Sequence, residues 1–173
     1  QRNTLYNAGI TGEPNRMVPI GEELSRGIEL DVAGKILPYW SVMASYSYNV
    51  AEITKAVAGT KDLNLQRPGT PRHSGNVWTK FVIPQGPMEG LGIGLGVHGV
   101  SERLGQVGRR EHVVSYPGYV LLDAALYYKV RDVQLQLNAN NLLDKSYYVS
   151  GYDRLRSFPG SPRQLSISAT YRF

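Results

Sequence analysis

The chain has 173 residues and a formal net charge of +5, with 19 glycines, 12 tyrosines and no cysteine. The lack of cysteine excludes disulfide scaffolds, thiolate metal sites and cysteine nucleophiles. The chain contains no run of about 18 apolar residues, so the sequence predicts no membrane-spanning helix. The chain opens on Gln1 without the basic and apolar regions of a secretory signal. We therefore expect that a signal was removed or that the chain is a piece of a longer protein.

Apolar and polar residues alternate with a period of two along most of the chain, which predicts strands with one apolar and one polar face. A less regular strand is expected at residues 1–10. Clear alternation follows at residues 28–36, 40–50, 76–83 (broken by Trp78), 91–98, 120–130, 133–140 and 164–173. No segment shows helical periodicity, so the predicted fold class is all-β, with about eight strands.

The lengths of these runs favour a membrane barrel. They cover about 10–15 residues, whereas strands of soluble proteins usually have about 5–6, and a tilted strand of that length crosses a bilayer. Short connections at 37–39, 84–90 and 130–132 alternate with long ones near 11–18, 55–71, 103–117 and 144–162. This layout predicts an antiparallel up-and-down transmembrane β-barrel in a bacterial outer membrane, with the apolar parity facing lipid.

A soluble β-barrel or sandwich with the apolar parity inside explains the alternation equally well. It explains less well the long strands and the polar faces built from Ser, Asn, Gln, Thr and Gly, because soluble surfaces usually carry more Lys and Glu. A complete eight-strand outer-membrane protein with a structural or adhesive role fits the length. Such a closed barrel must fill its interior with side chains, whereas the lumen-facing positions here are small.

Other functions find little support in the sequence. His73, His98 and His112 are scattered, and no nucleophile elbow or metal-binding pair accompanies them, so we expect neither an enzyme nor a resident metal. The alternating glycines Gly92, Gly94 and Gly96 lack the Lys-Ser/Thr of a phosphate loop. We expect another backbone or a plug to approach the lumen face there. Basic and aromatic residues are segregated between loops and strands, which argues against nucleic-acid binding.

Five segments carry a resemblance to one family, the TonB-dependent siderophore receptors, in the family's own order. They are Ser25–Asp31, Ala44–Thr54, Arg67–Ser74, Asn140–Tyr148 (with Leu143 where Phe is usual) and Pro159–Phe173. Ferrichrome-type and other hydroxamate-type receptors look most similar. The resemblance implies a barrel of about 22 strands and an N-terminal plug. Residues 1–173 would then be about eight C-terminal strands, without the plug and the earlier strands.

The resemblance also implies function and partners. The whole receptor would take up a ferric siderophore, with the iron held inside the siderophore and no cofactor, and TonB would drive transport through the N-terminal region. Basic outer loops would attract anionic ferric complexes and lipopolysaccharide phosphates. Tyr152 matches a position where ferrichrome receptors place a ligand-contacting aromatic residue. Arg154 and Arg156 are further ligand candidates by charge and location, while Tyr147 and Tyr148 are expected in an interfacial girdle.

The last strand resembles the signal by which barrel-assembly machinery recognises outer-membrane proteins. The chain ends in an aromatic residue, and apolar residues precede it at every second position. The residues of this expected signal are Leu165, Ile167, Ala169, Tyr171 and Phe173.

Overall fold

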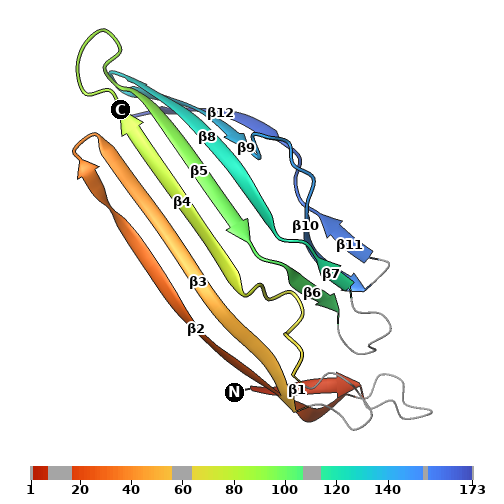
Figure 1. Cartoon of the computed structure of the whole chain (residues 1–173). Coiled ribbons are helices and arrows are strands. Elements are labelled where there is room, and N and C mark those ends of the chain that lie inside the picture. Colours follow the sequence, from red (N-terminus) through yellow and green to blue (C-terminus); the bar gives the residue numbers. More distant parts are fainter. Residues whose placement is uncertain (1, 8–16, 56–63, 107–113, 154–155, 173) are drawn as a thin grey trace.

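A computed structural model describes the chain except for residues 1, 8–16, 56–63, 107–113, 154–155 and 173 (Figure 1). Within the described part, all regular elements are strands. In chain order they are β1 (Arg2–Asn7), β2 (Met17–Leu37), β3 (Trp40–Lys55), β4 (His73–Val82), β5 (Leu91–Val100), β6 (Arg103–Gln106), β7 (Val114–Tyr116), β8 (Tyr119–Val130), β9 (Val133–Asn140), β10 (Tyr148–Asp153), β11 (Arg156–Pro159) and β12 (Gln164–Tyr171). No helix in these residues is long and apolar enough to cross a membrane.

Eight strands form one antiparallel sheet in the order β1-β2-β3-β4-β5-β8-β9-β12. These are the eight predicted strands, so the all-β up-and-down architecture is confirmed. The connections β2–β3, β4–β5 and β8–β9 lie at one end of the sheet, which we call the turn end (Figure 1). The opposite end, which we call the hairpin end, carries two separate two-stranded units, β6–β7 and β10–β11.

Three segments differ from the prediction. Residues 103–117 and 144–162 were expected to be loops, but they contain the hairpins β6–β7 and β10–β11. Strand β2 begins at Met17, eleven residues before the first clear alternation, so part of the expected loop near 11–18 is strand. Short segments such as Arg103–Gln106 are too brief for a period of two to stand out, and pairing with a neighbour makes them strands.

The sheet is open. Within the described residues β1 pairs only with β2 and β12 only with β9, and Figure 1 shows them at opposite edges of a curved sheet. Each edge leaves N–H and C=O groups without a strand partner, which a bilayer does not tolerate. The closed eight-strand barrel is therefore not what this chain forms, and an open sheet fits a portion of a larger barrel.

Strand register sorts the side chains into two faces, as predicted from parity. One row across five strands contains Val32, Ala44, Val77, Val97 and Leu122. A second apolar row nearer the turn end continues to Leu126, Leu137 and Ile167. The apolar face is exposed rather than covered: Ile28 is 70% exposed and Ile167 is 79% exposed. This contradicts the alternative of a soluble sandwich with the apolar parity inside and fits contact with lipid.

The opposite face is polar, with rows such as Asp31, Ser45, Asn76 and His98. Trp78 belongs to this face, which is why it broke the apolar parity in the sequence. Its indole lies over the glycines of β5: a Cβ added at Gly94 would approach Trp78 Cζ2 to 2.6 Å, and one added at Gly96 would collide with the ring. Gly94 and Gly96 therefore make room for a side chain of β4, and the approach of another backbone or a plug to this face stays a prediction.

Candidate functional site at the hairpin end

Two of the three predicted ligand residues lie on one hairpin. Tyr152 is in β10 and Arg156 in β11, two strands that pair with Asp153 opposite Arg156 and Gly151 opposite Ser157. The Arg156 side chain is exposed. The side chain of Tyr152 and the whole of Arg154 lie outside the described part of the structure. The backbone thus brings Tyr152 and Arg156 to the same hairpin, and their contact with a ligand stays a prediction.

Sequence reasoning missed the residue at the centre of the hairpin end, Arg103 on β6. Its side chain is buried at 3% exposure, and its Nη2 donates to the carbonyl oxygens of Tyr148 and, at 2.8 Å, Val149 on β10. The guanidinium carbon lies 5.4 Å from the centre of the Tyr119 ring, a cation–π geometry. In the sequence, Arg103 was visible only as one of several loop charges.

Tyrosines surround this arginine. Tyr119 and Tyr147 have ring centroids 4.4 Å apart, and Tyr116 and Tyr148 have centroids 5.9 Å apart. The Tyr116 hydroxyl shares a 2.8 Å hydrogen bond with Ser157 Oγ on β11. Tyr119 belongs to the polar face, in register with Val100. Tyr147 was expected in the lipid girdle, and its packing on Tyr119 corrects that expectation.

A buried asparagine explains one of the recognised motifs. Asn141, 4% exposed with a positive φ of 49°, follows β9 in the segment Asn140–Tyr148. Its side-chain Nδ2 donates to the carbonyl oxygens of Lys145 at 2.9 Å and Ser161 at 3.1 Å. Its side-chain Oδ1 accepts from the backbone N–H of Lys145 at 2.9 Å. Asp144 Oδ1 accepts from the Arg163 N–H at 2.8 Å. The motif therefore fixes the chain that enters β10 and the chain that leaves β11.

A groove runs along the polar face next to the hairpin end. It encloses about 350 Å³. Its lining residues include Glu29, Asp31, Ser47, Ser74, Asn76 and His98. His98 Nδ1 lies 3.4 Å from Asp123 Oδ2, and Asp123 Oδ1 accepts from the Asn141 N–H at 2.8 Å. The groove is thus polar, and the Asp123 carboxylate connects it to the Asn141 turn. In the described residues, no three His, Cys, Asp or Glu side chains group as a metal site.

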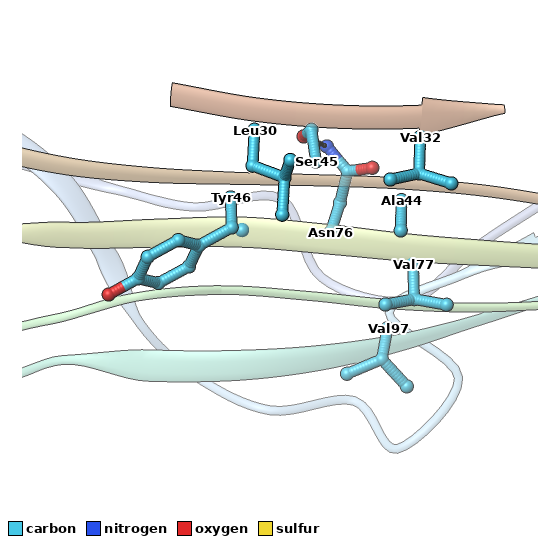
Figure 2. A pocket seen from close by; sticks show the side chains of 9 residues that line it. Leu30, Val32, Ala44, Ser45, Tyr46, Asn76, Val77 and Val97 are labelled. Atoms are coloured by element: carbon cyan, nitrogen blue, oxygen red, sulfur yellow. Dashed lines mark hydrogen bonds between the residues drawn. The ribbon is translucent and has the colours of Figure 1, made fainter. Parts of the chain in front are cut away.

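The apolar face carries a shallow hollow of about 290 Å³ (Figure 2). Figure 2 shows Leu30, Val32, Val77 and Val97 around it. The small residues Ala44 and Gly75 leave the space between these larger side chains. Because it opens on the face that contacts lipid, this hollow does not belong to the polar site.

Strand β12 holds the described part of the expected assembly signal. Leu165, Ile167, Ala169 and Tyr171 pair with Ala139, Leu137, Leu135 and Val133 of β9 and share the apolar face. Leu165 and Tyr171 are 68% and 63% exposed. Phe173 lies outside the described residues. The strand has the required pattern and edge position, while its recognition by assembly machinery stays a prediction.

Residues 1–142 match the family described as "TonB dependent receptor-like, beta-barrel". The metal-pseudopaline receptor CntO of Pseudomonas aeruginosa is 29% identical over 92% of this chain and 22% of its own length. The ferrichrome outer membrane transporter/phage receptor of Escherichia coli is 28% identical over 88% of this chain and 20% of its own length. The crystal structure of the ferric-catecholate import receptor Fiu from Escherichia coli superimposes with a TM-score of 0.77, at 26% identity, over 99% of this chain and 23% of that one.

These relatives are receptors and transporters, not enzymes. They are named for metal-pseudopaline, ferrichrome and ferric catecholates, so a hydroxamate-type receptor is not singled out. The chain spans about a fifth to a quarter of the length of the relatives that it matches. The open sheet, its exposed apolar face and the family match agree with one another. The chain belongs to the TonB-dependent receptor family and forms part of its outer-membrane β-barrel.

Proposed function

We propose that residues 1–173 are about eight C-terminal strands of an outer-membrane receptor that takes up ferric siderophores by a TonB-dependent mechanism. The observation that carries this proposal is the open, two-faced sheet, which matches the barrels of siderophore receptors over nearly the whole chain. Two unpaired edges require further strands to close a barrel. The plug and the segment that contacts TonB would lie in those further parts of the receptor.

The hairpin end faces the outside of the cell in this proposal, because outer-membrane barrels have short turns on the periplasmic side and longer connections outside. The hairpin β10–β11 would then bring Tyr152 and Arg156 toward an arriving complex, and Arg154, which lies outside the described residues, stays a candidate by its charge. Arg154 and Arg156 supply positive charge that attracts anionic ferric complexes. The iron would stay inside the siderophore as cargo, so the receptor would need no resident metal or cofactor.

The chemical class of the siderophore is the finer part of the proposal. The motifs favour a hydroxamate, and one relative is named for ferrichrome, while another is named for ferric catecholates. The polar face below the hairpins offers hydroxyl, amide and imidazole groups from Ser47, Asn76 and His98. Such groups bind oxygen-rich ligands of either class, so binding has to be compared directly.

The test uses the full-length receptor in cells that lack other siderophore receptors. We expect uptake of radioactive iron from ferrichrome, uptake that stops when TonB is depleted, and competition by a ferric catecholate only if the site accepts both. Iron uptake that persists without TonB would overturn the proposal. A folded receptor that takes up iron from neither complex would also overturn it.

The individual contact is tested by Tyr152→Ala. We expect about tenfold weaker binding of the preferred complex, since a buried aromatic contact commonly contributes this much. Tyr39→Ala at the turn end is the matched control, because Tyr39 packs edge-on against Phe81 far from the hairpins. Equal affinities for the two variants and the wild type would remove Tyr152 from the site.

Contacts with lipopolysaccharide through the basic outer connections, and recognition of β12 by barrel-assembly machinery, are further parts of this proposal. Recognition of β12 is supported by the exposed apolar side chains of Leu165, Ile167 and Tyr171 on this edge strand of the sheet.

A further inference from the structure

The two hairpins of the hairpin end belong to separate small sheets, but side chains join them. Strands β6 and β7 form one unit, and β10 and β11 form the other. No strand pairing links the two units in the described residues. The Asn141 turn fixes the chain at the base of β10–β11, and two further residues supply direct side-chain contacts between the two units.

The first is Arg103 on β6. Its Nη2 reaches two successive carbonyls of β10, those of Tyr148 and Val149, while its guanidinium lies over the Tyr119 ring at the start of β8. No carboxylate of the described residues pairs with it, and its buried Nη1 has no hydrogen-bond partner there. The guanidinium thus joins three strands by its planar geometry, which the point charge of a lysine cannot reproduce.

The second is Tyr116 on β7. Its hydroxyl bonds to Ser157 Oγ on β11, and its ring occupies space that Gly105 on β6 and Gly151 on β10 leave open. A Cβ at either glycine would overlap the ring. Tyr116 is therefore inserted between the two hairpins, directly beside Gly151, which precedes Tyr152 in the chain.

We propose that Arg103 and Tyr116 form a clamp that holds β10–β11 against β6–β7 and thereby positions the ligand-contacting part of β10. Arg103 and Tyr116 are positioning residues in this inference, because both are buried and act through the hairpin rather than on the ligand. The inference rests on the proposed function for its ligand, but the clamp itself is a property of the unliganded protein.

The clamp is tested on the full-length receptor without ligand, with spin labels on cysteines introduced at Ser115 of β7 and Ser150 of β10, both exposed. We expect one narrow distance distribution in the wild type. In Arg103→Lys the distribution should become about twice as wide, and in Tyr116→Phe, which keeps the ring and loses the Ser157 bond, it should widen less. Arg131→Gln at the exposed β8–β9 turn is the matched control and should change nothing. Unchanged distances in folded Arg103→Lys and Tyr116→Phe would overturn the clamp.

The positioning role is tested by ferric siderophore binding to the same variants. We expect Arg103→Lys to weaken binding about tenfold through lost preorganisation. In combination with Tyr152→Ala the losses should not add, because both act through one hairpin. Unchanged affinity despite widened distances, or fully additive losses, would contradict the positioning role. Absence of any siderophore binding in the wild type would instead count against the proposed function, while the distance measurement still decides the clamp.

Discussion

The sheet and its hairpin end are stabilised in different ways. In the sheet, rows of similar side chains repeat across neighbouring strands, so each position is defined mainly by the face it occupies. At the hairpin end, single buried polar residues such as Arg103 and Asn141 each bond several parts of the chain. A substitution in the sheet should therefore act through the face that it occupies, and one at the hairpin end through the hydrogen bonds that it removes.

The largest effect should come from a charge on the lipid face. Val77→Lys, near the middle of β4, should lower the free energy of unfolding by about 2–4 kcal/mol, the cost of a lysine near the bilayer midplane. The matched control is its neighbour Asn76→Lys, which faces the polar groove with Asp31 and should cost far less. Urea unfolding of the full-length receptor in lipid vesicles measures both. Equal costs would mean that the two faces are wrongly assigned.

At the hairpin end, we expect a substitution of Asn141 to lower the free energy of unfolding more than a substitution of any other residue except Arg103. Asn141→Ala removes three hydrogen bonds and should cost roughly 3 kcal/mol, at about 1 kcal/mol for each bond. A positive φ is also less favourable for alanine than for asparagine. Asn140→Ala, an exposed neighbour, is the control. If the two variants unfold at the same urea concentration, the turn does not depend on the buried amide.

A steric test probes the polar face of the sheet. Gly96→Ala should destabilise the receptor by about 1–3 kcal/mol, because its Cβ would collide with the Trp78 indole. Gly34→Ala is the control, since no atom lies within 4 Å of a Cβ added there. Thermal unfolding followed by heat-modifiable electrophoresis compares them. Adding Trp78→Ala should recover part of the loss, and a lack of recovery would show that the indole is not the obstacle.

The smallest effect is expected where the two regions meet. Asp123→Asn keeps an oxygen that can accept from the Asn141 N–H but removes the charge opposite His98. Both side chains are partly exposed, so the loss should stay below about 1 kcal/mol. Asp123→Ala, which also removes the acceptor, should cost more. Urea unfolding of both variants checks the order, and a reversed order would show that the charge matters more than the hydrogen bond.

Most of the sheet could be predicted from the sequence. Side chains of a strand point alternately to opposite faces, so Leu95, Val97 and their neighbours already indicated strand and face before any partner was known. The recognised motifs indicated the family. Trp78 was the exception, because it is a large aromatic residue at a position of the polar parity. The structure explains this position, since Gly94 and Gly96 of β5 leave room for its indole ring.

The hairpin end could not be predicted in the same way. Arg103 bonds to residues 45 and 46 positions away in the chain, and Tyr116 bonds to one 41 positions away. Neither partnership leaves a periodic trace, and β6, β7 and β11 have only three or four residues each. Sequence alone determined the strands, their two faces and the family, because those follow from local alternation and recognised segments. The identity of the buried residues that join the hairpins follows from the three-dimensional arrangement, because it depends on which distant strands the sheet brings together.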